Sequence, residues 1–142
     1  MTRVLITGAS DGLGRALAFA LAEQGYELVV HGRDADRLAE VAERTGAQAI
    51  RADLASLAEV RRLATAVEGG LDVLVNNAGI GFGAPGAPRE FSADGYELRL
   101  AVNYLAPYLL TQLLLPQLKQ AAPAGSSTWP RSGSDRSMWT IR

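Results

Sequence analysis

The chain has 142 residues, 48% of them hydrophobic and 20% charged, and its formal net charge at pH 7 is −1. This length and composition predict a single globular domain that can bury a core, and the balanced charge excludes the basic surface that recruits nucleic acid or an anionic membrane. The chain contains no cysteine, which excludes disulfide scaffolds and thiolate metal sites and suits a reducing compartment. We therefore expect a cytoplasmic protein without a metal site or a nucleic-acid partner.

One apolar stretch, YLAPYLLTQLLLPQL at residues 104–118, is hydrophobic enough to be tested as a membrane span. It falls short of the roughly 20 apolar residues that a bilayer requires, and it contains two prolines and two glutamines. The apolar run at the N-terminus is also too short for a signal peptide. We predict a buried or interface helix at residues 104–118 and no membrane span.

Hydrophobic periodicity alternates between strand and helix along most of the chain. Short β-rich runs predict strands over residues 3–7, 27–31, 47–54 and 71–79. Apolar residues at helical spacing predict a helix after each strand; the first three end at glycines 25, 46 and 69, and the last spans residues 92–119. Strands separated by helices in this way form right-handed crossovers, which place the strands parallel in one sheet with helices on both faces. The predicted fold class is therefore α/β, with the four strands in the order 3-2-1-4.

Polar residues ahead of the helices indicate where they begin. We expect Asp34 or Asp36 to open the second helix. Ser56 and Glu59 have the spacing of a capping box, in which each side chain bonds the free backbone N–H of the other residue. The third helix is therefore predicted to begin at Ser56.

The segment LITGASDGLGRAL, residues 5–17, joins the first strand to the first helix. Gly8 permits a tight exit from the strand, Gly12 lets the backbone approach a diphosphate, and Gly14 lets the helix lie close to the sheet. The helix N-terminus supplies unpaired N–H groups and a partial positive charge, which suit an anionic phosphate. Glycine spacing alone is a weak signal because any strand-to-helix turn can use glycine. Its position between a strand and an amphipathic helix favours a phosphate-binding turn.

Three motifs in this order resemble the short-chain dehydrogenase/reductase family: Thr7 followed by Gly-x-x-x-Gly-x-Gly, NNAG at residues 76–79, and the segment ADGYELRLAVNYLAPYLLTQLLLPQL. The last is most similar to the retinol-dehydrogenase-like branch, and the resemblance runs from about residue 4 to residue 119. It implies a Rossmann-type doubly wound sheet and NAD(P)-dependent hydride transfer between the nicotinamide and an alcohol or carbonyl group of a small molecule. The alternative is a flavodoxin-like or methyltransferase-like sheet with coincidental glycines.

The resemblance also implies which residues bind the nucleotide. In the family the glycine-rich turn holds the diphosphate, and an acidic residue after the third strand contacts the adenine amino group while its neighbour contributes backbone. The NNAG amides tie the central strands together and line the nicotinamide ribose. On this chain the implied binding residues are Thr7, Gly8, Ser10, Asp11, Gly12, Leu13, Gly14, Asp53, Leu54, Asn76, Asn77, Ala78 and Gly79.

The sequence HGRD ends the second strand, where a dinucleotide-binding fold reads the adenosine ribose. Gly32 leaves space for the adenosine, and the Arg33 guanidinium is expected to bind a 2′-phosphate, which favours NADP(H) over NAD(H). In the alternative, Arg33 pairs with Asp34 or Asp36 on the surface while Asp34 accepts a hydrogen bond from the ribose. We interpret His31 as a strand-end residue and not as a catalytic base.

Members of the family act with an Asn, Ser, Tyr and Lys tetrad, in which Tyr is the general acid/base and Ser polarises the carbonyl. Asn103 matches the catalytic Asn, whose backbone carbonyl holds a water on the proton path to the Lys. A helical carbonyl accepts from the N–H four residues later, and Pro107 has no N–H, so the Asn103 carbonyl is released. The alternative is a simple kink with Asn103 as a bystander. The helix at residues 92–119 also resembles the one through which many family members dimerise, which predicts a homo-oligomer.

No Tyr follows Tyr108 and no Lys follows Lys119, so we expect the Ser and Tyr-x-x-x-Lys parts of the tetrad to be missing. We predict an incomplete domain at residues 1–124, with a bare outer edge on its fourth strand, and an irregular tail at residues 125–142. A shifted codon frame over the tail permits a strand and a Ser similar to those of the family, which suggests a frameshifted reading; the alternative is an ordinary disordered C-terminus. We expect weak nucleotide binding without turnover. The alternatives are a non-catalytic NADP(H)-binding protein and a nonfunctional truncated product.

Overall fold

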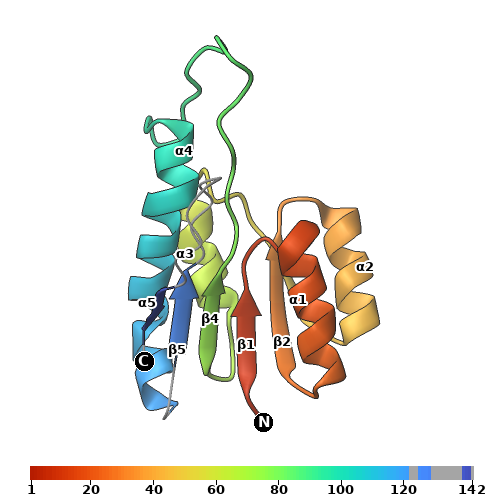
Figure 1. Ribbon diagram of the computed structural model, residues 1–142. Coiled ribbons are helices and arrows are strands. Elements are labelled where there is room, and N and C mark those ends of the chain that lie inside the picture. The colour runs from red at the N-terminus through yellow and green to blue at the C-terminus, as the bar shows by residue number, and fades with distance from the viewer. Residues whose placement is uncertain (122–124, 129–138, 142) are drawn as a thin grey trace.

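The computed structural model describes residues 1–121, 125–128 and 139–141, in which one sheet lies between two layers of helices (Figure 1). The strands are β1 (Arg3–Ile6), β2 (Glu27–Gly32), β3 (Gln48–Arg51), β4 (Val73–Asn76), β5 (Gly125–Thr128) and β6 (Trp139–Ile141). The helices are α1 (Gly12–Glu23), α2 (Ala35–Thr45), α3 (Leu57–Ala66), α4 (Leu98–Leu100), the π-helix η1 (Ala101–Leu105) and α5 (Ala106–Gln120). The sheet order is β3-β2-β1-β4-β5-β6, and each neighbouring pair is parallel except β5 with β6.

The sheet separates two hydrophobic cores because alternate residues of its central strands point to opposite faces. Val4 and Ile6 of β1 belong to the same core as Val41 of α2. Leu5 of β1 belongs to the other core, which includes Leu110 of α5. Helices α1 and α2 therefore cover one face of the sheet, and α3 and α5 cover the other (Figure 1).

The predicted α/β fold and the strand order 3-2-1-4 are confirmed, and the sheet continues beyond these four strands. Strand β5 pairs in parallel with β4, and β6 pairs antiparallel with β5. The expectation of a bare β4 edge and an irregular tail is therefore wrong for β5 and β6. A ladder needs only backbone N–H and C=O groups, so a segment without an apolar period can still pair with an open edge. The frameshift hypothesis stays a prediction, and residues 122–124, 129–138 and 142 lie outside the described residues.

Side-chain caps define the starts of α2 and α3. Asp34 caps α2 by accepting a hydrogen bond from the Arg37 N–H at 3.0 Å, and Ser56 caps α3 by accepting from the Glu59 N–H at 3.4 Å. The expected capping box is only half formed, because the Ser56 N–H donates to the Asp53 carbonyl. The Glu59 carboxylate accepts from the Asp53 N–H instead. Glu59 therefore ties α3 to the segment that follows β3.

The last long helix begins at Leu98 and not at residue 92 as predicted. The Ser92 N–H donates to the Tyr96 carbonyl at 2.7 Å, and Gly95 between them has a φ of 82°. This left-handed conformation favours glycine and makes residues 92–96 a turn that the helical periodicity did not reveal. The Glu97 carboxylate then caps the helix.

Among the described residues, one helical stretch, Leu98–Gln120, is long and apolar enough to cross a membrane by length and composition alone. A core helix can meet the same criteria, and in this stretch Ala106, Leu110, Leu114 and Leu118 form a buried stripe at helical spacing. The absence of a membrane span stays a prediction.

Gly14 of α1 packs against the segments that follow β1 and β4, and a substitution there tests this packing. A Cβ at Gly14 would overlap the Gly8 carbonyl oxygen and the Asn77 amide nitrogen, so we expect Gly14→Ala to lower the free energy of unfolding by about 2 kcal/mol or more. Gly81→Ala is the matched control because a Cβ there would meet nothing within 4 Å, and its effect should stay within about 0.5 kcal/mol. Denaturant unfolding measures the stability of both variants. A Gly14→Ala variant as stable as Gly81→Ala would contradict the close packing at Gly14.

Candidate functional site

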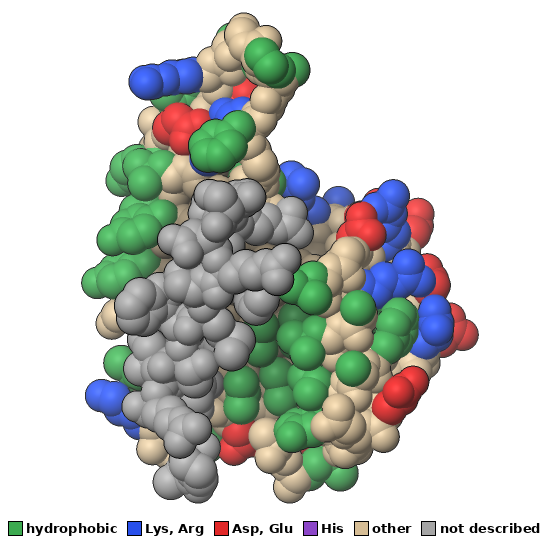
Figure 2. All heavy atoms as spheres, in the orientation of Figure 1, with side chains coloured by type: hydrophobic (Ala, Val, Ile, Leu, Met, Phe, Trp, Pro, Cys, Tyr) green, Lys and Arg blue, Asp and Glu red, His purple; other side chains and the backbone are tan. Residues whose placement is uncertain are grey.

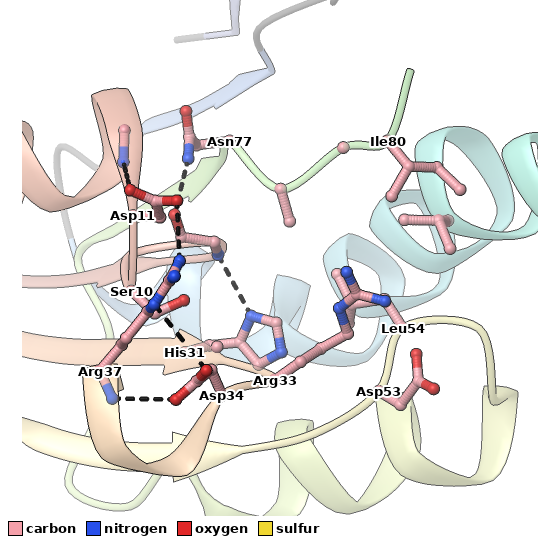
Figure 3. A pocket seen from close by; sticks show the side chains of 16 residues that line it. Ser10, Asp11, His31, Arg33, Asp34, Arg37, Asp53, Leu54, Asn77 and Ile80 are labelled. Carbon is pink, nitrogen blue, oxygen red and sulfur yellow. Dashed lines mark hydrogen bonds and ion pairs between the residues drawn. The ribbon is translucent and has the colours of Figure 1, made fainter. Parts of the chain in front are cut away.

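A cavity of about 610 Å³ lies at the carboxyl ends of β1, β2, β3 and β4 (Figure 3). This edge of a doubly wound parallel sheet is where such folds bind ligands. Most of the predicted nucleotide-binding residues line it: Gly8, Ser10, Asp11, Gly12, Arg33, Asp53, Leu54, Asn77, Ala78 and Gly79. The other predicted site residues lie outside the lining: Thr7, Leu13, Gly14, Asn76 and Asn103. His31, Gly32, Asp34, Arg37, Ile80 and Val102 complete the lining.

The turn between β1 and α1 forms one wall of this cavity. Its conformation requires glycine, because φ is 66° at Gly8 and 54° at Gly12. A Cβ at Gly8 would also lie 2.8 Å from the Ala78 Cα, which shows how closely the turn approaches the NNAG segment. The Asp11 carboxylate caps α1 by accepting from the Gly12 N–H at 2.8 Å. The unpaired N–H groups at the α1 N-terminus and their partial positive charge therefore lie at the edge of the cavity.

Gly32 does not leave the free space that the sequence suggested. A Cβ at Gly32 would lie 2.8 Å from the Ser10 Oγ, so the Ser10 side chain already occupies that position. The missing side chain at residue 32 instead lets the β1–α1 turn approach the end of β2.

Thr7 and Asn77 connect the end of β1 to the end of β4. The Thr7 hydroxyl accepts hydrogen bonds from the backbone N–H groups of Asn77 (3.1 Å) and Ala78 (3.0 Å) and donates to the Val75 carbonyl (3.3 Å). The Asn77 carboxamide donates in return to the carbonyl oxygens of Thr7 (3.0 Å) and Gly8 (3.2 Å). The expected role of the NNAG amides in tying the central strands together is confirmed for Asn77.

Asn76 contributes to the same scaffold from the other face of the sheet. Its side chain is buried, and its carboxamide donates to the Thr111 hydroxyl of α5 at 3.1 Å. Asn76 therefore holds α5 against β4 and does not reach the cavity.

At the end of β2, the nearby acidic residues Asp11 and Asp34 pair with Arg37 and not with Arg33. Asp34 faces Arg37 (Figure 3), whose backbone N–H and guanidinium lower the pKa of the Asp34 carboxyl below its usual value. Asp11 lies across the turn and also pairs with Arg37, at 3.1 Å. Arg33 makes no ion pair with a described residue, and it extends toward Asp53 and Leu54. The expected alternative pairing of Arg33 with Asp34 or Asp36 is therefore not found, whereas a hydrogen bond from the ribose to Asp34 stays a prediction.

His31 is a site residue whose contacts the sequence did not reveal. It lies one residue before the end of β2, close to the predicted strand end, and its side chain is buried and lines the cavity. Its Nδ1 accepts from the Gly8 N–H at 3.3 Å, and its Nε2 lies 2.9 Å from the Ala52 carbonyl oxygen. Burial lowers the pKa of His31 below its ordinary value, which favours the neutral ring. A polar residue at the end of an otherwise apolar buried strand is the signal that could have identified it.

Asn103 lies in the π-helical turn η1. The Ala106 N–H donates to the Ala101 carbonyl, five residues earlier, in place of the usual four. Such turns occur frequently at functional sites. The Asn103 carboxamide accepts from the Ile80 N–H at 2.8 Å and donates to the Ile80 carbonyl at 2.9 Å. The side chain therefore fixes the loop after NNAG, and Pro107 lies at the point where the helix returns to α-geometry.

A parallel sheet of this order, with a glycine-rich turn and a cavity at its carboxyl edge, defines a Rossmann-type nucleotide-binding domain. The chain belongs to the short-chain dehydrogenase family, because the model of short chain dehydrogenase matches residues 2–126. The resemblance found in the sequence is thereby confirmed.

Three similar proteins show how much of a family member the chain represents. An uncharacterized oxidoreductase of Emericella nidulans is 47% identical over 118 residues, which cover 80% of this chain and 46% of that protein. Retinol dehydrogenase 13 of Mus musculus is 36% identical over 131 residues, which cover 85% of this chain and 38% of that protein. The structure of the Pseudomonas aeruginosa RhlG/NADP active-site complex has 38% identity and a TM-score of 0.73, and the match covers 87% of this chain and 50% of that one. The chain thus spans half or less of the length of these relatives.

The Thr7 hydroxyl provides a test of the junction between β1 and β4. Thr7→Val keeps the shape of the side chain but leaves the Asn77 and Ala78 N–H groups without their acceptor, so the free energy of unfolding should fall by about 2 kcal/mol. Thr7→Ser keeps the hydroxyl and should lose less than about 1 kcal/mol. Thermal and denaturant unfolding compare the two variants, and a Val variant as stable as the Ser variant would contradict the assigned role.

Proposed function

We propose that this chain binds NADP(H) in the cavity at the carboxyl edge of its sheet. It forms the nucleotide-binding part of an oxidoreductase that transfers hydride between the nicotinamide and an alcohol or carbonyl group of a small molecule. The observation that carries this proposal is the convergence of the β1–α1 turn, the NNAG segment and Arg33 on one cavity. Family membership supports the oxidoreductase class, and the similar RhlG structure is an NADP complex.

The residues of the cavity suit the three parts of a dinucleotide. A Cβ at Gly12 would meet nothing within 4 Å, so the α1 N-terminus is open toward a ligand and fits a diphosphate. Arg33, Asp53 and Leu54 form the end of the cavity that would hold the adenosine. Residues 77–80 form the other end, which would hold the nicotinamide ribose. The bound nicotinamide would supply or accept the hydride.

The charge arrangement at β2 favours NADP(H) over NAD(H). A carboxylate there would accept a hydrogen bond from a free 2′-hydroxyl, whereas an arginine suits a 2′-phosphate. Asp34 caps α2 and faces Arg37, which leaves the Arg33 guanidinium as the group that would bind the additional phosphate.

The proposed catalytic contribution of this chain is the backbone carbonyl of Asn103. Its carboxamide is held by Ile80, so the backbone is the part of the residue that could hold a water for proton transfer. The sequence shown contains no Tyr-x-x-x-Lys segment after the long helix. We therefore propose that this polypeptide by itself binds nucleotide but does not reduce a carbonyl.

The stretch Leu98–Gln120 supports a second proposal, association with another copy of the chain. Hydrophobic side chains gather along the edge formed by α4, η1 and α5 (Figure 2). Leu100, Tyr104, Tyr108 and Leu113 are exposed there, and the two tyrosine rings stack with centroids 6.4 Å apart. An exposed apolar helix face of this kind is typical of subunit interfaces.

The nucleotide preference can be measured by titrating the purified chain with NADPH and NADH by calorimetry. We expect NADPH to bind more tightly, and Arg33→Ala to weaken NADPH binding by about tenfold while leaving NADH binding unchanged. Arg61→Ala serves as the control, because it removes an exposed arginine of α3 that does not line the cavity.

The outcomes separate the parts of the proposal. A parent chain that binds neither nucleotide contradicts the proposed function. If NADPH and NADH bind with equal affinity and Arg33→Ala changes neither affinity, only the preference for NADP(H) is contradicted. Rapid carbonyl reduction by the purified chain with NADPH would contradict the proposal that it does not turn over.

A further inference from the structure

His31 is the single histidine of the chain, and it lies where three parts of the site meet. Only 1% of the residue is exposed, and the ring lines the cavity beside the β1–α1 turn (Figure 3). Its Nδ1 is 3.3 Å from the Gly8 nitrogen, and its Nε2 is 2.9 Å from the Ala52 carbonyl oxygen. Its own backbone carbonyl accepts from the Ala9 N–H at 2.8 Å. One residue therefore holds two successive amides of the turn and reaches the end of β3.

These partners are compatible with one protonation state of the ring. A backbone N–H can only donate, so Nδ1 must present its lone pair to Gly8. A carbonyl can only accept, so Nε2 must carry the proton that faces Ala52. Burial favours the neutral ring. The charged groups that act on it are Arg33, which opposes a second positive charge, and Asp53 and Glu59, which favour one.

The contact with Gly8 fixes the direction of a peptide group at the start of the turn. The preceding amide, that of Thr7, donates to the Val75 carbonyl of β4, and the following amide, that of Ala9, donates to the His31 carbonyl. The Gly8 N–H instead donates to the side chain of His31, and without the imidazole it would lose this acceptor. A partly buried donor without an acceptor is unfavourable, so the turn would reorient to satisfy it elsewhere.

We propose that the His31 side chain is a positioning residue of the nucleotide site. By accepting a hydrogen bond from Gly8, its neutral Nε2–H form holds the β1–α1 turn in the shape that presents the α1 N-terminus to a diphosphate. This inference rests on the proposed function, because the ligand is the dinucleotide proposed above. His31 acts through the turn and contacts no reacting atom.

Two substitutions separate the two hydrogen bonds of the ring. His31→Asn places an amide oxygen near the position of Nδ1, so it keeps the acceptor for Gly8 and loses the donor to Ala52. His31→Gln reaches the position of Nε2, so it keeps the donor to Ala52 and loses the acceptor for Gly8. Each variant retains one bond and is the control for the other.

The first measurement is hydrogen exchange of the Gly8 amide in the nucleotide-free protein, and the second is the Kd for NADPH at pH 8. In His31→Gln we expect the Gly8 amide to exchange about tenfold faster and NADPH to bind about tenfold more weakly. In His31→Asn both values should stay within about threefold of those of the parent.

Equal losses of affinity in the two variants would overturn the proposal. The proposal would also be overturned if the loss of NADPH affinity followed the free energy of unfolding of each variant and not its Gly8 amide exchange. A purely structural role of His31 predicts that pattern. The ring nitrogens of the parent can also be observed by NMR, and a proton on Nδ1 would overturn the proposal even if neither variant folds. A parent chain that binds no NADPH overturns the proposed function and the positioning role together, while Gly8 exchange still reports the contact.

Discussion

The Thr7 hydroxyl and the Asn77 carboxamide bond across the gap between the end of β1 and the end of β4. At this point both strands have ended, so a sheet ladder can no longer satisfy the backbone groups that these side chains bind. Gly14 lets α1 lie against the junction without an intervening side chain. The α1 N-terminus is thereby held at the edge of the cavity, and the geometry of the whole site depends on this closure.

The acidic groups around the cavity are paired with an arginine of α2. Asp11 caps α1 and Asp34 caps α2, and both carboxylates also face the Arg37 guanidinium. These acidic groups would otherwise repel an anionic ligand at the mouth of the cavity. Their pairing with Arg37 reduces that repulsion, while Arg33 stays directed toward the end of the cavity that is proposed to hold the adenosine. This distribution suits the proposed dinucleotide, which carries several phosphate charges.

Much of the fold could be predicted because its signals are local. Apolar periodicity indicated the four parallel strands, and the glycines of the first turn marked the close approach that the structure contains at Gly8 and Gly14. The features that could not be predicted depend on contacts between distant segments. The imidazole of His31 lies 23 residues from Gly8 in sequence, and no pattern around either residue indicates their contact.

Other differences between the sequence predictions and the structure involve strand pairing, helix register and a tertiary side-chain contact. The pairing of β5 with β4 uses main-chain groups that every sequence carries, so side-chain periodicity could not reveal it. Asn103 lies in a π-helical turn that the helical periodicity did not indicate, and the release of its backbone carbonyl by Pro107 stays a prediction. Glu59 was assigned to Ser56 by spacing, yet its carboxylate bonds the Asp53 N–H across the loop. Spacing rules describe isolated helices, and tertiary neighbours supplied a different partner.

The most direct measurement is a map of backbone amide chemical shifts in the nitrogen-15-labelled chain as NADPH is added. If the cavity binds the dinucleotide as proposed, the largest changes will occur at Gly12, Leu13 and Gly14, with further changes at Ala78 and Gly79. Shifts confined to other parts of the chain, or none at saturating NADPH, would contradict the assignment of this cavity as the nucleotide site.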